Sequence, residues 1–234
     1  MNIAQIIAKK AKGEKIVMLT AYDFPFAAIL DQAGVDIILV GDSLGNVALG
    51  YRDTLPVSME EMVVHTRAVA RAVNKALVVG DMPFGSFQQG DDKAVGNAIK
   101  LVKAGAQAVK IEGAQYISAI KKIIRAGIPV MGHIGFTPQS VNLTGYKMQG
   151  KTGSQAAAIA RDARILEKAG CFALVLELIP EALAGRIKKN MKIPTIGIGA
   201  GTKTDGQVLV TNDLLGLFDD PPSFAHRMAD LKTV

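Results

Sequence analysis

Short apolar segments alternate with longer amphipathic segments along the whole chain, and this alternation constrains the fold more than any other feature. Most apolar segments are continuous runs, such as "IILV" at residues 37–40. Continuous runs are typical of parallel strands that are covered on both faces. The predicted strands are Ile16–Thr20, Ile37–Val40, Ala76–Gly80, Ala108–Ile111, Pro129–Gly132, Ala173–Leu176, Thr195–Ile198 and Gln207–Val210.

The segments between these strands have the spacing of amphipathic helices, and most of them end in glycine. Gly34, Gly105, Gly127 and Gly170 stand where a helix end needs a positive φ. Strands alternating with helices in 234 residues predict a (β/α)8 TIM barrel, formed by residues 1–234 as a single domain. Only "GAGTKTDG" separates the last two strands, which is too short for a helix. The alternative is an open doubly wound sheet, but "MLTAYDFP" lacks the glycine fingerprint that usually follows its first strand.

The composition fits a globular protein with an aliphatic core. Hydrophobic residues make up 49% of the chain and aromatic residues only 5%, so Ile, Val, Leu and Ala must fill the core. The formal charge is +6, but the basic residues are scattered, which argues against nucleic acid as a partner. No apolar run predicts a membrane span, and "MNIAQIIAKKAKGEK" has apolar and basic residues in the wrong order for a secretory signal. We therefore expect a cytoplasmic protein.

Polar side chains close or follow most of the predicted strands. They are Asp42, Ser43, Asp81, Lys110, Glu112, His133 and Glu177. In a parallel barrel the active site lies at the C-terminal ends of the strands, so these side chains should converge on one mouth. Residues two apart share a face of a strand, so Lys110 and Glu112 point inward when Ile111 packs against the helices. The same reasoning turns Glu177 inward and Leu176 outward.

The first of these residues also have purely structural interpretations. Asp42 or Asp81 would cap the start of the following helix, as aspartate often does. Ser43 would be an ordinary turn hydroxyl.

The later residues are weighed in the same way. Lys110 would form a structural ion pair with Glu112, and His133 would be a satisfied histidine near the core. Glu177 is harder to explain structurally, because a carboxylate flanked by leucines in a strand is costly to bury.

The carboxylates together indicate a metal site. Carboxylates in one cavity repel each other and raise each other's pKa, and a bound divalent cation resolves that conflict. Oxygen ligands in a chain with one cysteine and three histidines favour Mg²⁺ or a similar hard cation. We predict that Asp42, Asp81 and Glu112 hold the metal.

The remaining polar residues suggest the reaction. Lys110, Ser43 and His133 would bind an anionic substrate, and Glu177 would act as a base. This set suits proton abstraction next to a carbonyl, with the metal stabilising the charge that develops. A 2-oxo acid has the matching chemistry.

Several stretches that carry these residues resemble one family. They are "MLTAYDFPFA", "VGDSLGN", "VVGDMPFGSF", "AVKIEG", "IPVMGHIGFTPQSVNLTGYKMQGK", "LVLELIP" and "IPTIGIGAG". They occur in the family's order and, with their neighbours, cover most of residues 17–218. "GDSLG", "GHIGFTPQS" and "GIGAG" together are far more specific than a lone glycine motif. On these motifs the chain is identified as a member of the ketopantoate hydroxymethyltransferase family.

The resemblance implies a fold, an activity and an assembly. The fold is a (β/α)8 barrel similar to the phosphoenolpyruvate mutase and isocitrate lyase group. The reaction moves a hydroxymethyl group from 5,10-methylenetetrahydrofolate to 3-methyl-2-oxobutanoate, giving 2-dehydropantoate on the way to pantothenate and coenzyme A. The family uses Mg²⁺, and its members are homo-oligomers, commonly decamers.

The resemblance also implies roles for single residues. The metal positions are Asp42, Asp81 and Glu112. The substrate positions are Asp42, Ser43, Asp81, Lys110 and His133. Glu177 matches the base that takes the C3 proton of the oxo acid.

The C-terminal part departs from the family pattern. Asn212-Asp213 replaces the usual His-Asp, and the sequence ends with "FAHRMADLKTV", where members continue with another helix. Two other functions stay open, the first from the similarity to the related barrel group and the second from the shortened end. One is a related barrel lyase or mutase, although Cys171 at a strand start is badly placed for that group's loop cysteine. The other is a non-catalytic oligomerising barrel, which has no reason to keep mutually repelling acids.

Overall fold

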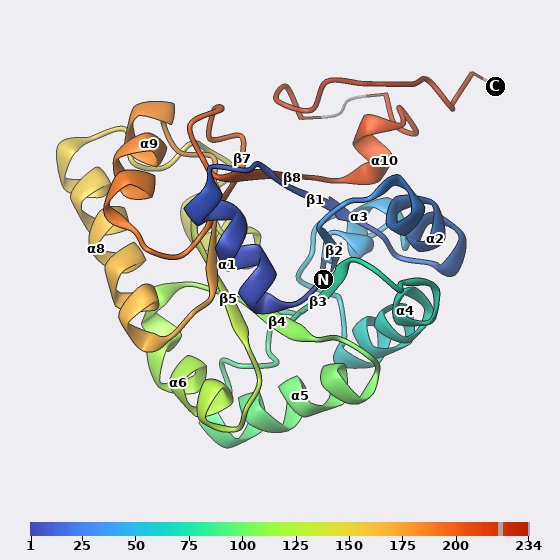
Figure 1. Ribbon diagram of the computed structural model, residues 1–234, viewed down its shortest axis with the longest axis horizontal. Helices are drawn as coiled ribbons and strands as arrows, with labels where there is room; N and C mark the ends of the chain where they lie inside the picture. The colour runs from blue at the N-terminus through green and yellow to red at the C-terminus, as the bar shows by residue number, and fades with distance from the viewer. Residues whose placement is uncertain (220–221, 234) are drawn as a thin grey trace.

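The computed structural model describes residues 1–219 and 222–233, and within them eight parallel strands form a closed barrel (Figure 1). Each strand pairs with the next one in the chain, and β8 closes the ring against β1. The strands are β1 (Ile16–Thr20), β2 (Ile37–Val40), β3 (Leu77–Asp81), β4 (Ala108–Glu112), β5 (Val130–Gly135), β6 (Ala173–Glu177), β7 (Thr195–Ile198) and β8 (Gly206–Leu209). The predicted TIM barrel is confirmed, and the doubly wound alternative is wrong.

Three strands have the predicted bounds, and the others differ at their ends. The largest difference is in β5, which runs to Gly135 where the prediction stopped at Gly132. β3, β4 and β6 each extend one residue further, to Asp81, Glu112 and Glu177. These carboxylates are therefore the last residues of their strands, held by the sheet ladder instead of by a loop.

Helices cover the outside of the barrel in Figure 1. The longer ones are α2 (Phe24–Ala33), α4 (Met59–Ala72), α5 (Asp91–Lys103), α6 (Ile117–Arg125), α8 (Gly153–Ala169) and α9 (Glu181–Asn190). Short elements lie in the loops: α3 (Leu44–Val47), η1 (Ala114–Tyr116), η2 (Pro138–Ser140), α7 (Val141–Thr144) and α10 (Thr211–Leu214). Residues 199–205, all of them described, join β7 to β8 without a helix, as predicted. Gly34 and Gly170 end their helices with φ of 82° and 100°, so the glycine signal was read correctly.

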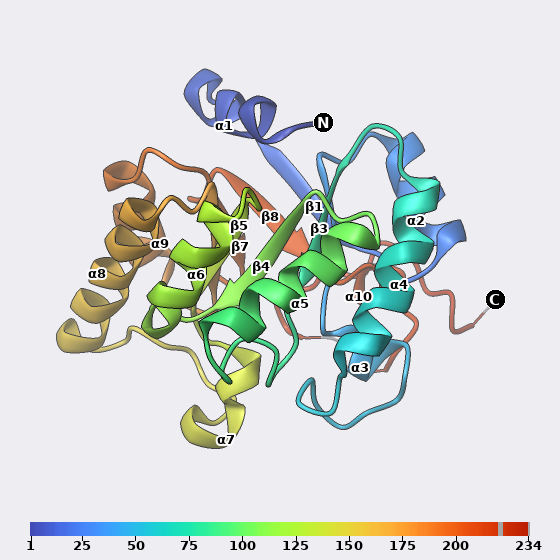
Figure 2. The same ribbon diagram turned by 90° about the horizontal axis from the view of Figure 1, so that it is seen from below.

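Helix α1 (Ile3–Lys12), which the sequence analysis missed, closes the N-terminal end of the barrel. Figure 2 shows it at one end of the molecule and α3 and α7 at the other. Asn2 and Gln5 form a capping box at its start, a signal that was available in the sequence. Ile6 from this helix is fully buried among the side chains of the barrel interior. The C-terminal ends of the strands lie at the opposite end of the barrel.

The strands divide their apolar side chains between two layers. Inside the barrel, Met18, Val79 and Met131 pack together with Ile6. The alternate side chains pack outward against the helices; examples are Ile38, Val40, Ile111, Leu174 and Leu176. Each fully buried side chain of this size contributes about 1.5–3 kcal/mol. Burial on both faces explains the continuous apolar runs, and it leaves Lys110 and Glu112 pointing inward as predicted.

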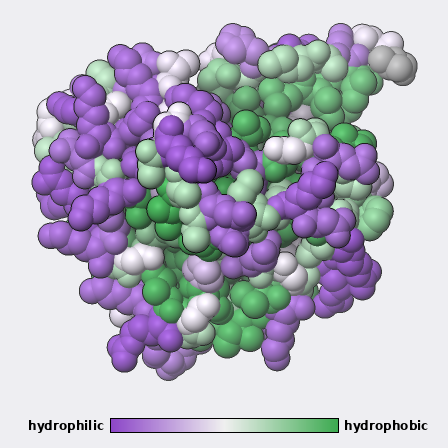
Figure 3. All heavy atoms as spheres, viewed as in Figure 1, coloured by the Kyte–Doolittle hydropathy of each residue, from purple (hydrophilic) through white to green (hydrophobic). Residues whose placement is uncertain are grey.

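The outer face of β1 and β8 is the least covered part of the barrel. Val17, the second residue of β1, is 47% exposed. A green area in the upper right of Figure 3 shows apolar atoms at the surface where the C-terminal segment runs in Figure 1. Within residues 1–219 and 222–233, no helix has the length and apolar character needed to cross a membrane.

Candidate active site

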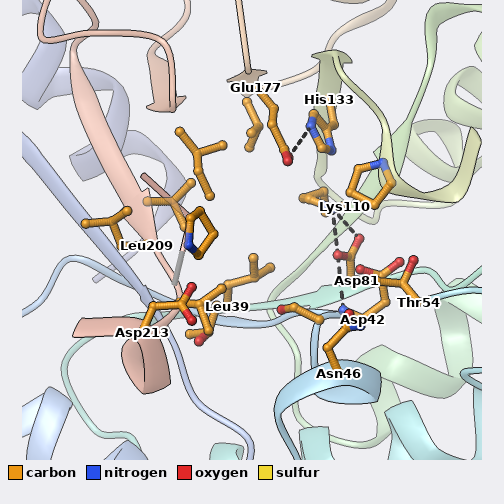
Figure 4. Close-up of a pocket in the computed structure, with 18 of the residues that line it drawn as sticks. Leu39, Asp42, Asn46, Thr54, Asp81, Lys110, His133, Glu177, Leu209 and Asp213 are labelled. Atoms are coloured by element: carbon orange, nitrogen blue, oxygen red, sulfur yellow. Dashed lines mark hydrogen bonds and ion pairs between the residues drawn. The ribbon is translucent and has the colours of Figure 1, made fainter. Parts of the chain in front are cut away.

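A cavity of about 330 Å³ opens at the C-terminal ends of the strands (Figure 4). Its volume lies in the range of about 300–1,000 Å³ that small-molecule sites occupy. The predicted site residues all line it: Asp42, Ser43, Asp81, Lys110, Glu112, His133 and Glu177. Side chains that are far apart in the sequence thus share one space.

Lys110 and Asp81 form a buried ion pair in this cavity. The ammonium nitrogen lies 2.7 and 2.6 Å from the two carboxylate oxygens of Asp81. The register of β3 and β4 places these two residues directly opposite each other. Burial alone would lower the pKa of Lys110, but Asp81 and Glu112 outweigh burial and raise that pKa. Glu112 is 3.8 Å away, so the main partner of Lys110 is Asp81 and not Glu112.

His133 lies between two carboxylates. Its Nδ1 is 3.4 Å from an oxygen of Glu112, and its Nε2 is 3.1 Å from an oxygen of Glu177. Neither contact has good hydrogen-bond geometry, so they are best described as ion-pair contacts. Burial lowers the pKa of an imidazole, but the two carboxylates outweigh burial and raise the pKa of His133 to about 9. A protonated ring therefore ties β4 to β6 at the base of the cavity.

Asp42 and Ser43 follow β2 and do not act as helix caps. Ser43 is the residue before α3 but makes no capping hydrogen bond; its hydroxyl instead pairs with the Tyr22 hydroxyl at 2.8 Å. α5, the helix after β3, begins after Gly90, so Asp81 caps nothing either. Asp42 is buried, and burial together with the charges of Asp81 and Glu112 raises its pKa. The capping interpretation of both aspartates is wrong.

Gln139 joins the carboxylates, and the sequence analysis missed it. Its side-chain amide donates to Asp42 at 2.8 Å and to the Met82 carbonyl at 2.9 Å. Its backbone N–H donates to Glu112 at 3.0 Å. One residue from the loop after β5 therefore orients carboxylates from β4 and from the loop after β2. The available signal was its place inside "GFTPQS", but no local pattern indicates its partners.

The donor chemistry of the cavity fits a hard divalent cation. One oxygen of Glu112 is buried without a hydrogen-bond partner. The backbone N–H of Asp42 is 3.4 Å from an oxygen of Asp81, so these two residues are close. Burial and the neighbouring carboxylates raise the pKa of Asp42 despite Lys110, and a divalent cation would relieve that repulsion. Among residues 1–219 and 222–233, however, no three His, Cys, Asp or Glu side chains already converge as metal ligands. Asp81 is turned toward Lys110 instead.

Two further residues of the cavity, and one beside it, were not predicted. Tyr22 is buried behind the cavity wall and holds Ser43, and Tyr146 lines the cavity and stands 65% exposed. Tyr146 contacts Phe136 edge to face, with ring centroids 4.8 Å apart. Asp213 lines the cavity from α10 and is only 9% exposed. In the sequence, Asp213 stands out only because it follows Asn212, which replaces the family's usual histidine.

The raised pKa of His133 has a consequence for stability. Because its folded pKa of about 9 exceeds the usual value of about 6.5, its contribution is complete below pH 6.5 and lost as pH rises through 9. We expect the unfolding free energy of the metal-free protein to fall over this range, and to fall less in His133→Gln. Guanidinium unfolding in chelator at several pH values measures this. His226→Gln, at an exposed histidine, is the control, and equal slopes for all three proteins would contradict the expectation.

Comparison with known proteins points to one family. The sequence profile of the family described as ketopantoate hydroxymethyltransferase matches residues 1–234. The 3-methyl-2-oxobutanoate hydroxymethyltransferase of Thermoanaerobacter sp. (strain X514) is 55% identical over 229 residues, which cover 96% of this chain and 84% of that protein. The enzyme of the same name from Thermococcus kodakarensis is 53% identical over 232 residues, covering 98% and 81%.

Solved structures with the same fold are much more distant in sequence. Phosphoenolpyruvate phosphomutase from Streptomyces platensis subsp. rosaceus superposes with a TM-score of 0.68 at 15% identity, covering 92% of this chain and 82% of that one. A 2,3-dimethylmalate lyase, described as a PEP mutase/isocitrate lyase superfamily member, gives 0.65 at 15%, covering 88% and 80%. At such identities the likeness shows the fold alone, and that fold is the one predicted.

Proposed function

The chain belongs to the ketopantoate hydroxymethyltransferase family, and we propose that it transfers a hydroxymethyl group from 5,10-methylenetetrahydrofolate to 3-methyl-2-oxobutanoate, forming 2-dehydropantoate and tetrahydrofolate. The observation that carries this proposal is the shared cavity, in which Glu177 and the Lys110–Asp81 pair line the same space. A base and a cation within one cavity suit removal of a proton next to a carbonyl. The high identity to enzymes of this name supports the choice of substrates.

The oxo acid is held by groups that match its charge. Lys110 faces the cavity as a buried cation, and Ser43 offers a hydroxyl that Tyr22 keeps in place. Asp42, Asp81 and Glu112 would hold Mg²⁺, which supplies positive charge beside the oxygen that becomes negative. Asp42 and Asp81 would thus contribute to binding of the oxo acid indirectly, through the cation that they hold. His133 lines the pocket and positions Glu177 through the 3.1 Å contact.

Bond making follows from the placement of Glu177. The carboxylate removes the C3 proton of the oxo acid, and the electron pair moves into the enolate. C3 then forms a bond to the methylene carbon of the folate as the first of that carbon's two bonds to folate nitrogens breaks. Water displaces the second folate nitrogen and supplies the hydroxyl of the hydroxymethyl group. The two released nitrogens take up two protons, the C3 proton returned by Glu177 and one proton from the water.

The lyase or mutase alternative has little support. Cys171, two residues before β6, is 2% exposed, and burial raises its pKa to about 12. A buried thiol that resists ionisation at the N-terminal end of the barrel is a small apolar side chain and not a catalytic group. The non-catalytic alternative would leave the Lys110–Asp81 pair and the orphaned Glu112 oxygen without purpose.

Metal removal tests the proposed reaction. With Mg²⁺ and both substrates we expect 2-dehydropantoate, detected by mass spectrometry, and with excess chelator we expect none. Restoring Mg²⁺ or Mn²⁺ should restore the product. Product formation at an unchanged rate in chelator would exclude the metal role. Failure to form product with any added divalent cation would overturn the function itself.

The assembly and location of the protein stay predictions. We propose a homo-oligomer, as the family resemblance implies, acting in the cytoplasm.

A further inference from the structure

One half of the cavity has no part in the reaction described so far. Its wall is apolar and includes Leu39, Ile198, Val208 and Leu209. Figure 4 places Asp213 beside Leu39 and Leu209, across the cavity from Lys110 and His133. The cavity volume of about 330 Å³ is in the range of sites that hold larger ligands, so it leaves room beyond a small branched oxo acid.

Asp213 is the one charged group of this apolar half, among the residues that the structure describes. It is 9% exposed, and across residues 1–219 and 222–233 its carboxylate has no hydrogen bond and no ion pair. Burial raises its pKa accordingly. A carboxylate that is buried without partners lowers the stability of the folded protein. Its presence here therefore argues for a ligand that donates hydrogen bonds to it.

The position of Asp213 is firmly determined. Two residues earlier, Thr211 donates its backbone N–H to the Thr20 hydroxyl at 3.1 Å and its own hydroxyl to the Thr20 carbonyl at 2.6 Å. Thr20 is the last residue of β1, so α10 is tied directly to the barrel. The carboxylate is therefore presented by a rigid element, as a binding group requires.

Tyr146 lies within electrostatic reach of both Asp213 and the base. After burial, the charges of Glu177 and Asp213 are the causes that raise its pKa. Its ring rests edge-on against Phe136 and stays 65% exposed at the mouth. An exposed aromatic ring with a fixed support can stack on a flat ligand.

We propose that this half of the cavity binds the pteridine ring of the reduced folate, with the Asp213 carboxylate accepting hydrogen bonds from the ring's N3–H and 2-amino group. The inference rests on the proposed function and identifies where the second substrate sits. A 2-amino-4-oxopteridine presents two parallel N–H donors on one edge, which match the two oxygens of a carboxylate. Its flat faces suit the apolar wall and the Tyr146 ring, and its one-carbon unit then faces Glu177 and the oxo acid.

Asp213→Asn tests this assignment, because asparagine keeps the shape but turns one acceptor into a donor. We expect the KM for methylenetetrahydrofolate, and the dissociation constant of tetrahydrofolate by calorimetry, to rise about 10- to 100-fold. C3 proton exchange of the oxo acid without folate should stay close to that of the unmodified protein, which also shows that the variant is folded. Asp230→Asn, at an exposed carboxylate, is the matched control and should change neither.

A folate analogue that lacks the 2-amino group tests the proposed hydrogen bonds to Asp213 directly. A tetrahydrofolate analogue with a methyl group in place of the 2-amino group should bind the unmodified protein about tenfold or more weakly than tetrahydrofolate. Asp213→Asn should distinguish the two ligands much less, as in a double-mutant cycle. Equal discrimination by both proteins, or unchanged tetrahydrofolate binding in Asp213→Asn, would overturn the assignment. Equal losses of exchange and folate binding would show that Asp213 is merely structural.

The failure of this assignment differs from failure of the function. If the unmodified protein binds tetrahydrofolate through Asp213 but forms no product, the pteridine site stands and the reaction is wrong. If product forms and Asp213→Asn binds folate normally, the reaction stands and the pteridine site is wrong. An unmodified protein that does not bind tetrahydrofolate would overturn both.

Discussion

A Glu177→Gln protein is expected to exchange the C3 proton of 3-methyl-2-oxobutanoate about 10²–10⁴-fold more slowly than the unmodified protein, as befits loss of a general base. The amide keeps the volume of the side chain at the end of β6 but cannot accept a proton. Glu177 lines the cavity with its carboxylate 3.1 Å from the His133 ring, where the proposed base would meet the oxo acid. Deuterium exchange at C3, followed by NMR with Mg²⁺ and without folate, isolates this step from transfer.

Two further variants sharpen the result for Glu177. Glu177→Asp retains a carboxylate but withdraws it by one methylene, so its exchange rate should lie between those of Glu177→Gln and the unmodified protein. Glu60→Gln makes the same chemical change at an exposed site in the first turn of α4 and should exchange normally. If Glu177→Gln exchanged the C3 proton as fast as the unmodified protein, Glu177 would not be the base. A loss in Glu60→Gln would show that the assay reports general damage.

Lys110→Met is expected to lower the unfolding free energy of the metal-free protein at neutral pH by about 3–5 kcal/mol, the usual cost of removing one partner from a buried ion pair. Met has a similar length but carries no charge. Both oxygens of Asp81 lose the ammonium that lies 2.7 and 2.6 Å away, and Glu112 loses a cation at 3.8 Å. Urea unfolding in chelator, monitored by circular dichroism, measures the change. The variant should also lose affinity for the oxo acid.

A surface lysine supplies the contrast for Lys110. Lys122 pairs with Asp92 where both side chains are largely exposed, so Lys122→Met should change stability little. Acid should partly rescue Lys110→Met, because protonation removes the unpaired negative charge of the carboxyl groups around it. Equal stability of both variants would mean that the Asp81 carboxylate is already neutral or hydrated in the folded protein.

The fold was largely predictable because its signals are local. The apolar run 37–40 and the glycines at 34 and 170 are each recognisable within a few residues, and β2 and both helix ends lie where these signals put them. Helix α1 was not predicted, although Asn2 and Gln5 form a capping box at its start. The apolar and basic residues of this segment were compared only with the pattern of a secretory signal. Strand ends were less certain, because the polar side chains that end the apolar runs still belong to the ladders.

The sequence predicted which residues gather at the candidate site, but it did not predict which of them interact with each other. Strand ends in a parallel barrel meet at one mouth, so the gathering of Asp81, Glu112 and Glu177 followed from topology alone. Their partners did not follow. Gln139 reaches Asp42 across 97 residues of chain, and no spacing rule connects the two. Asp213 belongs to a stretch that departs from the family motif, but nothing in the sequence indicated that its side chain lines the cavity.

The sequence by itself determined the barrel, the end that carries the chemistry and the residue types found there, because apolar periodicity and glycine ends are properties of neighbouring residues. Only the tertiary structure decided which charges pair. Lys110 and Glu112 are neighbours on one face of β4, yet Lys110 binds Asp81 because the register of β3 and β4 sets those two side by side. Only the tertiary structure placed Asp213 in the cavity, because the hydrogen bonds between Thr211 and Thr20 connect α10 to β1.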